Sequence, residues 1–298
     1  PALSGKTVFI TGATGLIGSQ MVRTLLEANR LYDADITVAA FIRNEQKAQA
    51  MFEDVLPNGK LDFVIGDLSR PVEYNKPVDY IVHGASPTGS KFFVESPVET
   101  IETAIYGTDR LRQFARDKQV SGMVYLSSLE VYGVPDGKNP TISESDYGLI
   151  DPLSVRSSYS EGKRMVECLC ASYASEYGVP VKVARLSQTF GAGVEYHDGR
   201  VFAEFARCLM EKKDIVLHTD GSTVRSYCYT ADAVCALYTI LLKGESGEAY
   251  NVTNMDTACS IREMAELVAG LEPEAGVNVR IEIPEDIASF GYNPQMII

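Results

Sequence analysis

The sequence has no apolar run close to the roughly 20 residues that a membrane-spanning helix needs. It also has no excess of basic residues, because 27 Lys and Arg stand against 40 Asp and Glu, for a formal net charge of −13. This balance argues against broad electrostatic binding to nucleic acid or to an anionic membrane. Backbone amides and a few arginines can still build a local site for an anionic small ligand. We therefore expect no nucleic-acid partner and no membrane partner.

Residues that bind metals are few and scattered. The three histidines, His83, His197 and His218, have no ligand spacing. The cysteines show no paired metal-ligand spacing either; they are Cys168, Cys170, Cys208, Cys228, Cys235 and Cys259. The first residues show no signal-peptide pattern. We predict six reduced thiols, no metal site and a cytoplasmic protein.

Hydrophobic residues (45%) and charged residues (22%) occur at the levels of an ordinary globular protein. Short β-rich runs alternate with amphipathic segments, which indicates parallel βαβ units. The predicted strands span residues 6–11, 36–42, 63–65, 80–83, 123–126 and 181–186, and the predicted helices span 16–28, 98–117 and 158–177. The fold predicted is α/β, a Rossmann doubly wound parallel sheet over residues 1–187 with a smaller C-terminal substrate-binding lobe over 188–298. Parts of 224–252 are expected to return to the sheet domain. The chain ends soon after Gly291–Pro294, in mid-motif, so a further C-terminal element is expected.

A glycine-rich loop, Thr11-Gly-Ala-Thr-Gly-Leu-Ile-Gly18, follows the first predicted strand and opens the first predicted helix. In this setting Gly12 permits a tight turn, Gly15 lets the backbone approach a pyrophosphate, and Gly18 lets the helix pack closely on the strand. The phosphates would meet backbone amides at the helix N-terminus. The alternative is a merely tight strand-to-helix turn. The predicted cofactor-binding residues of the loop are Gly12, Thr14, Gly15, Leu16, Ile17 and Gly18.

The end of the second predicted strand bears on the choice between NAD and NADP. An acid there favours NAD, and a nearby arginine accommodates the 2′-phosphate of NADP. Phe41 and Ile42 occupy the expected acid position, and Arg43 follows. Arg43 is therefore predicted to contact the cofactor, either at a 2′-phosphate or by stacking on adenine. The prediction is NAD, with NADP as the alternative.

Tyr159 and Lys163 lie four residues apart in a predicted helix and therefore on one helix face. A free phenol has a pKa of about 10. A cationic neighbour favours the phenolate, so we expect Lys163 to lower the pKa of Tyr159. Tyr159 could then exchange a proton with an alcohol while a hydride moves to or from a nicotinamide.

Taken together, these segments resemble the extended short-chain dehydrogenase/reductases of the NAD-dependent epimerase/dehydratase type, which act on nucleotide sugars. The resemblance covers essentially the whole chain. It implies that Asp67 and Leu68 hold the adenine, that Ala85 and Ser86 line the cofactor channel, and that Ser128 completes a Ser/Tyr/Lys triad. It also implies a homodimer. The motifs are Thr11–Gly18, Gly66–Leu68, His83–Pro87, Ser127–Gly133, Tyr159–Lys163 and Arg225–Tyr227.

Within this family the sequence is most similar to UDP-glucuronate decarboxylases, through Ala85–Pro87, Ser96–Thr100, Asp198–Val201 and Glu130 with the Val-Tyr-Gly that follows it. After oxidation of the sugar at C4, a carboxylate beside C5 can take a proton there or steer loss of a C5 carboxyl. Simple 4-epimerases do not need such a group. The alternative for Glu130 is a loop carboxylate that caps a turn.

Three departures leave the exact substrate open. Leu129 replaces the Asp that dTDP-glucose-type dehydratases place beside this Glu, Ala104 replaces a common Asn, and Gln188 stands where an Asn often contacts the sugar nucleotide. An Arg fork suits a diphosphate, so Arg225 is predicted to bind it with help from Arg200, although either could be a surface ion-pair partner. The predicted substrate-binding residues are Ser86, Pro87, Gln188, Arg200 and Arg225.

The leading hypothesis is an enzyme that uses retained NAD(P) to oxidise a nucleotide sugar at C4 before decarboxylation or elimination. Its predicted catalytic residues are Ser128, Glu130, Tyr159 and Lys163. The alternatives are a nucleotide-sugar 4-epimerase, an NAD(P)-dependent reductase that releases its cofactor, and a non-catalytic NAD(P) sensor.

Overall fold

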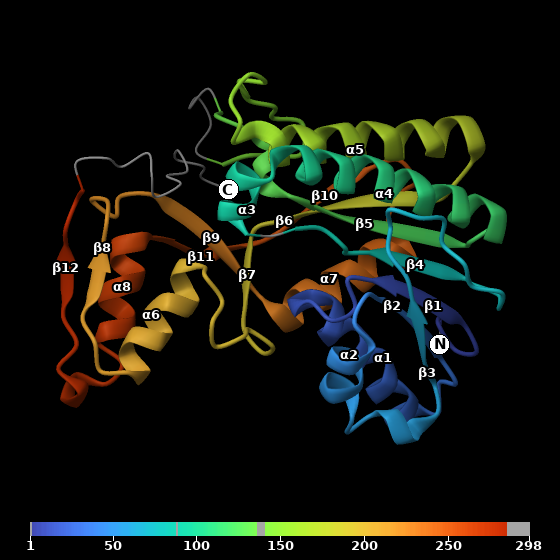
Figure 1. Ribbon diagram of the computed structural model, residues 1–298, viewed down its shortest axis with the longest axis horizontal. Helices are drawn as coiled ribbons and strands as arrows, with labels where there is room; N and C mark the ends of the chain where they lie inside the picture. Colours follow the sequence, from blue (N-terminus) through green and yellow to red (C-terminus); the bar gives the residue numbers. More distant parts are fainter. Residues whose placement is uncertain (1, 88, 136–140, 285–298) are drawn as a thin grey trace.

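The computed structural model describes residues 2–87, 89–135 and 141–284, and its centre is a sheet of seven strands (Figure 1). Every neighbouring pair in this sheet is parallel. The strand order is β10-β6-β5-β4-β1-β2-β3, which is a Rossmann order with a seventh strand at one edge. The predicted fold class is therefore confirmed. The strands are β1 (Thr7–Thr11), β2 (Thr37–Ile42), β3 (Leu61–Ile65), β4 (Tyr80–His83), β5 (Gly122–Ser128), β6 (Val181–Leu186) and β10 (Ala249–Val252).

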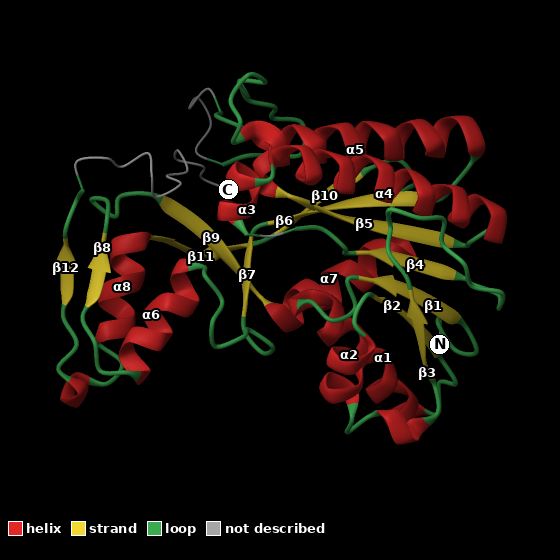
Figure 2. Ribbon diagram, viewed as in Figure 1, coloured by secondary structure: helices red, strands yellow, loops and turns green. Residues whose placement is uncertain are grey.

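Helices cover both faces of the sheet (Figure 2). Alternate residues of each strand reach opposite faces, so Val8 and Ile10 pack toward one helical layer and Phe9 toward the other. Because both faces are covered, β1 and β2 are apolar over most of their length rather than alternating. One layer contains α1 (Leu16–Tyr32), α2 (Glu45–Phe52) and α7 (Thr230–Lys243), and the other contains α3 (Ser90–Glu95), α4 (Pro97–Lys118) and α5 (Ser157–Tyr177).

The predicted elements are present, with some changes of length. β5 extends to Ser128 instead of ending at Leu126, so the predicted triad serine is the last residue of a strand. α1 continues four residues beyond Ala28 and ends where Asp33 adopts a left-handed conformation, with φ of 51°. Helix α2 was not predicted, because it buries only Ala48 and Phe52 and so has little apolar periodicity.

The smaller lobe lies beyond the carboxyl end of β6, at the left of Figure 1. The chain leaves β6 at Leu186 and enters β7 at Gln188, and β7 pairs with β9 outside the main sheet. The chain then returns to the main domain through α7 and β10, whereas β9 stays in the lobe. The elements of the lobe are β7 (Gln188–Phe190), α6 (Val201–Met210), β8 (Ile215–Leu217), β9 (Val224–Tyr229), β11 (Asn254–Ser260), α8 (Ile261–Ala269) and β12 (Val279–Ile281).

Three further observations concern the described part of the chain. None of its helices is long and apolar enough to cross a membrane. No group of three or more His, Cys, Asp or Glu in it could bind a metal ion. All six cysteines are free thiols. The expectation that concerned Gly291–Pro294 falls on residues outside the described ranges.

Candidate active site

The glycine loop between β1 and α1 needs two of its glycines for steric reasons. Gly12 has a φ of 69°, a conformation that side chains disfavour, and a Cβ there would lie 2.7 Å from the carbonyl carbon of Gly84. A Cβ on Gly18 would collide with the carbonyl oxygen of Gly12. The loop is thus folded back on itself and against the residues that follow β4. A Cβ on Gly15 would lie 3.2 Å from the Gly12 carbonyl oxygen, which is a tight contact, although Gly15 is otherwise exposed.

The N-terminus of α1 is arranged to receive an anion. Its N-cap is Gly15, which has no side chain to accept hydrogen bonds from the first turn, and the first turn has no acidic residue. The amides of Leu16, Ile17 and Gly18 precede the first possible helical hydrogen bond, which Ser19 makes to Gly15. These open amides and the helix dipole fit a pyrophosphate. Thr14 is half-buried in the same turn.

A buried histidine joins the loops that follow β1 and β4. The Thr108 hydroxyl donates to the Ala104 carbonyl at 2.6 Å, so it accepts from His83 Nε2 at 2.9 Å. His83 Nδ1 then accepts from the Thr11 hydroxyl at 2.8 Å, and Thr11 accepts from the Ala85 amide at 3.2 Å. Burial lowers the pKa of His83 to about 3, so the ring is neutral, as this chain of bonds requires. His83 therefore positions the predicted cofactor-channel residue Ala85.

The residues predicted to contact adenine lie at the carboxyl ends of β2 and β3. Arg43 and Asp67 are both exposed there. Hydrogen bonds from Ser69, with a smaller contribution from the charge of Arg43, lower the pKa of Asp67. Leu68 differs from its neighbours, because its side chain is 7% exposed and packs in the core beneath α4. Only the backbone of Leu68 could contact a ligand, and its carbonyl accepts from Arg110 at 2.7 Å.

Ser128, Tyr159 and Lys163 come together where β5 ends against α5. Lys163 is 3% exposed, and its Nζ donates to the Leu126 carbonyl at 2.8 Å. The same nitrogen lies 5.6 Å from the centre of the Tyr159 ring. Burial lowers the pKa of Lys163 to about 7, although the charge of Glu167 opposes the shift. The lysine can therefore change protonation near neutral pH.

The expected lowering of the Tyr159 pKa is wrong for the protein without ligands. Burial of the phenol raises its pKa, and the negative charge of Glu130 raises it further. A hydrogen bond with Ser128 and the charge of Arg156 oppose the shift without reversing it. The lysine does not produce the expected effect, because its own burial disfavours the charged form. Tyr159 is accordingly protonated near neutral pH and able to donate a proton.

Glu130 has an arginine partner that the sequence did not identify. Arg156 Nη1 and Nη2 donate to the two carboxylate oxygens of Glu130, each at 3.0 Å. Ser160 adds a hydroxyl at 3.2 Å, and the Glu130 amide donates to Ser128 Oγ at the same distance. The Glu130 backbone is thus part of the turn after β5, while its side chain is in an ion pair. Arg156 is three residues before Tyr159, about one helical turn away, so its spacing predicted a place near Tyr159 but not the contact with Glu130.

Phe93 of α3 covers Tyr159. The two rings stack with centroids 4.1 Å apart and an interplanar angle of 15°. Phe93 is 2% exposed, its carbonyl accepts from Ser158 at 3.1 Å, and the Arg156 guanidinium lies 5.1 Å from its ring centre. Phe93 thus fixes the position of the Tyr159 ring by packing.

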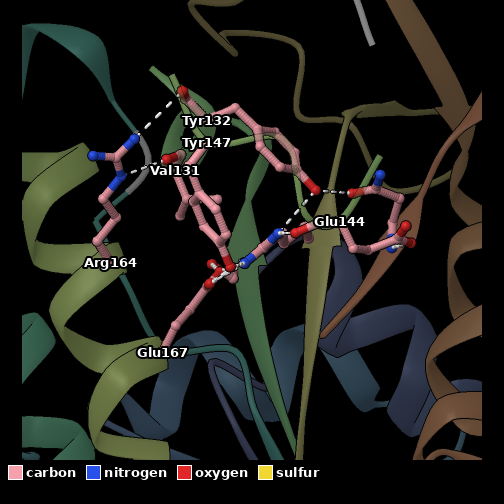
Figure 3. Close-up of polar contacts among 9 residues, drawn as sticks. Val131, Tyr132, Glu144, Tyr147, Arg164 and Glu167 are labelled. Atoms are coloured by element: carbon pink, nitrogen blue, oxygen red, sulfur yellow. Dashed lines mark hydrogen bonds and ion pairs between the residues drawn. The ribbon is translucent and has the colours of Figure 1, made fainter. Parts of the chain in front are cut away.

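Polar contacts join α5 to the segment that follows β5 (Figure 3), and the buried Arg185 of β6 takes part in them. Arg185 is 2% exposed and donates to Glu167 at 2.6 Å, to the Tyr147 hydroxyl at 2.7 Å and to the Tyr132 hydroxyl at 3.0 Å. Burial disfavours its charge, but the bonds and charge of Glu167 prevail and raise the pKa of Arg185. Glu167 also accepts from Ser127, which directly precedes the predicted triad serine, at 2.5 Å. The network therefore joins the end of β5 to α5.

The predicted substrate residues fall into two groups. Ser86 and Pro87 follow β4, and the Ser86 hydroxyl donates to the Pro87 carbonyl at 3.1 Å. Gln188 begins β7 and lies opposite Tyr227 of β9, two residues beyond Arg225. Arg225 is 7% exposed, and its Nη1 donates to the Val224 carbonyl at 2.9 Å.

Arg200 precedes α6. Its guanidinium pairs with Asp198 through both Nε and Nη2, with the shortest contact at 2.5 Å. Its Nη1 reaches the Thr189 carbonyl in β7 at 3.4 Å. Arg200 is therefore beside the strand of Gln188, and its charge is already balanced.

Comparison with known proteins agrees with this arrangement. A model of the NAD dependent epimerase/dehydratase family matches residues 8–253. UDP-glucuronic acid decarboxylase 6 of Arabidopsis thaliana is 30% identical over 287 residues, which cover 95% of this chain and 79% of that protein. A dTDP-glucose 4,6-dehydratase from Streptomyces venezuelae, solved with NAD bound, superimposes with a TM-score of 0.78 and 25% identity over 98% of this chain and 88% of that one.

A UDP-N-acetylglucosamine 4-epimerase from Methanobrevibacter ruminantium also superimposes with a TM-score of 0.78, over 95% of this chain and 87% of that one. At 20% identity this likeness concerns the fold alone. The family match extends across the main sheet, the glycine loop and the helix of Tyr159 and Lys163. The chain therefore belongs to the NAD dependent epimerase/dehydratase family.

Proposed function

We propose that the protein uses NAD to oxidise a nucleotide sugar at C4 and then decarboxylates it, as a UDP-glucuronate decarboxylase does. The observation that carries this proposal is the position of Glu130, which adjoins both Ser128 and Tyr159. A carboxylate at that point has no use in 4-epimerisation. It has a use at C5, where the C5–C6 bond of a 4-keto uronate breaks and a proton is then added. The named Arabidopsis relative supports the same reaction.

The proposed cofactor site draws on three parts of the chain. The amides at the start of α1 would bind the pyrophosphate, Arg43 and Asp67 would flank the adenosine, and Ala85 and Ser86 would line the nicotinamide side. When bound, NAD supplies a reversible hydride acceptor. The exposed Arg43 keeps NADP as the alternative cofactor.

Three residues would move or orient protons at C4. The deprotonated form of Tyr159 would take the proton of the C4 hydroxyl as a hydride leaves C4, and the phenol would return a proton when C4 is reduced again. Ser128 would donate a hydrogen bond to the same oxygen. Lys163 adjusts the charge beside the phenol, since burial places its pKa at about 7. Gln188, Arg200 and Arg225 would bind the nucleotide diphosphate, with Ser86 and Pro87 near the sugar.

Leu129 favours decarboxylation over elimination. Its side chain is 5% exposed and apolar, so it cannot protonate a leaving hydroxyl. Loss of carbon dioxide needs no acid of that kind, because the C4 ketone accepts the electrons of the breaking C5–C6 bond. The 4-epimerase, dehydratase and reductase readings remain the competing enzyme functions, and an NAD(P) sensor is the non-enzymatic one.

Mass spectrometry of products from UDP-, dTDP-, GDP- and CDP-sugars tests the proposal. We expect UDP-glucuronate to lose carbon dioxide without net consumption of NAD. A product isomeric with its substrate would establish a 4-epimerase instead, and loss of water would establish a dehydratase. Stoichiometric consumption of NAD(P)H would contradict a retained cofactor. If no sugar nucleotide is altered, the enzymatic proposal fails.

We also propose a homodimer formed through α4 and α5. These helices expose apolar side chains on the outer surface of their layer, including Val98 (60% exposed), Tyr106 (56%) and Met165 (50%). Covering such side chains stabilises association by roughly 25 cal/mol for each Å² of apolar area. Light scattering at micromolar concentration should give twice the mass of one chain, and Met165→Glu should shift the equilibrium toward monomer. A monomeric parent protein would contradict the proposal.

A further inference from the structure

The ion pair between Arg156 and Glu130 raises a question that depends on the proposed function. If Tyr159 contacts the C4 oxygen and Glu130 acts at C5, the C6 group, which is bonded to C5, lies next to Glu130. In a uronate that group is a carboxylate, so it would approach another carboxylate. Like charges that close repel strongly in a partly buried site. An isolated Glu130 would therefore favour sugars with a neutral C6 group.

Arg156 removes that repulsion. Its two terminal nitrogens pair with both oxygens of Glu130, which is the strongest geometry available to an Arg and a carboxylate. The side chains are only 20% and 15% exposed, so solvent screens the pair weakly. The guanidinium is also fixed by the Phe93 ring, 5.1 Å from its centre. The site thus presents a neutral pair to the sugar.

The Nε atom of Arg156 provides a second observation. Its Nε is enclosed and has no hydrogen-bond partner among the described residues. The guanidinium therefore has an unpaired donor, although both terminal nitrogens are bound to Glu130. Because this nitrogen is enclosed, it is not open to a ligand, so Arg156 can act on the sugar only through its pair with Glu130.

We propose that Arg156 determines the preference of the site for a sugar with a C6 carboxylate over one with a C6 hydroxymethyl group, by neutralising Glu130. Arg156 is a specificity residue in this proposal. Because it stays paired with Glu130, it does not hold the substrate carboxylate in a direct salt bridge, which would stabilise that group against loss of carbon dioxide.

Calorimetric binding of UDP-glucuronate, UDP-glucose and UDP to the NAD-loaded protein tests the proposal. A Tyr159→Phe background slows turnover during the measurement, by roughly 10²- to 10⁴-fold. We expect Arg156→Gln to weaken UDP-glucuronate binding by roughly 10- to 100-fold, with UDP-glucose and UDP changed by less than about threefold. Arg156→Lys retains the charge and should preserve most of the preference. Arg262→Gln, which breaks an exposed ion pair with Glu266, is the matched control and should change none of the three.

The double variant Glu130→Gln with Arg156→Gln gives the sharper result. If Arg156 acts by neutralising Glu130, removal of both charges should restore UDP-glucuronate binding to within about threefold of the parent. Failure to restore it would overturn the proposal in favour of a direct contact between Arg156 and the substrate. Equal losses for all three ligands in Arg156→Gln would overturn it in favour of a structural role. If the parent protein does not prefer the uronate at all, it is the proposed decarboxylase function that fails.

Discussion

Tyr159→Phe should lower turnover by roughly 10²- to 10⁴-fold and leave dinucleotide binding nearly intact, because general acid–base help is worth about that much. The phenol oxygen makes the proton transfer, whereas the ring serves for packing. Its stacking on Phe93, with centroids 4.1 Å apart, does not involve the hydroxyl. Steady-state product formation and NAD binding, measured on the same preparation, separate the two effects.

Tyr32→Phe is the matched control for this variant. Tyr32 is 78% exposed at the end of α1, so loss of its hydroxyl should change neither activity nor cofactor binding. Activity of Tyr159→Phe within a factor of a few of the parent would remove Tyr159 from the mechanism. A parallel loss of NAD binding would instead show that the hydroxyl supports the cofactor site.

The glycine loop and the spacing of Tyr159 and Lys163 were predictable because both patterns are local in sequence. Gly12, Gly15 and Gly18 lie within one loop, and the structure shows the predicted tight turn at Gly12, whereas Gly18 is required by its contact with the Gly12 carbonyl oxygen rather than by packing on the strand. Tyr159 and Lys163 are one helical turn apart, so their common face followed from spacing alone. The parallel sheet followed from the alternation of apolar runs with amphipathic segments.

The environment of these residues was not predictable in the same way. Arg156 reaches Glu130 across 26 positions of chain, through the path that follows β5, and no local pattern fixes that distance. Phe93 reaches Tyr159 from a six-residue helix with almost no periodic signal. The raised pKa of Tyr159 depends on this burial and on Glu130. The rule that a cation beside a phenol lowers the pKa of the phenol therefore predicted the wrong direction for Tyr159. Lys163 is itself buried, so its charged form is disfavoured.

Glu130→Gln should separate the two halves of the proposed reaction. Glutamine preserves size and can still accept a hydrogen bond from Arg156, but it can neither take up a proton nor deliver one to C5. Oxidation at C4 depends on Tyr159 and Lys163, so it should proceed. Reduced nicotinamide and a 4-keto sugar should then accumulate on the enzyme. Single-turnover absorbance in the reduced-nicotinamide band, recorded with enzyme in excess over substrate, measures this directly. Glu161→Gln, on the exposed part of α5 and 3.9 Å from Arg164, is the control that should behave as the parent.

Two other outcomes of Glu130→Gln have distinct readouts. If Glu130 only completes the turn after β5, the variant should lose about 0.5–2 kcal/mol of unfolding free energy, as for loss of a cap, and should turn over normally. If the reaction is 4-epimerisation, no C5 chemistry exists to block, and solvent deuterium should be absent from C5 of the product in both parent and variant. Decarboxylation requires a new C5–H bond, so the parent product formed in deuterium oxide should carry the label there. Full steady-state activity in Glu130→Gln would therefore contradict the decarboxylase and leave the epimerase or reductase, whereas accumulated reduced cofactor with labelled parent product would place the carboxylate at C5.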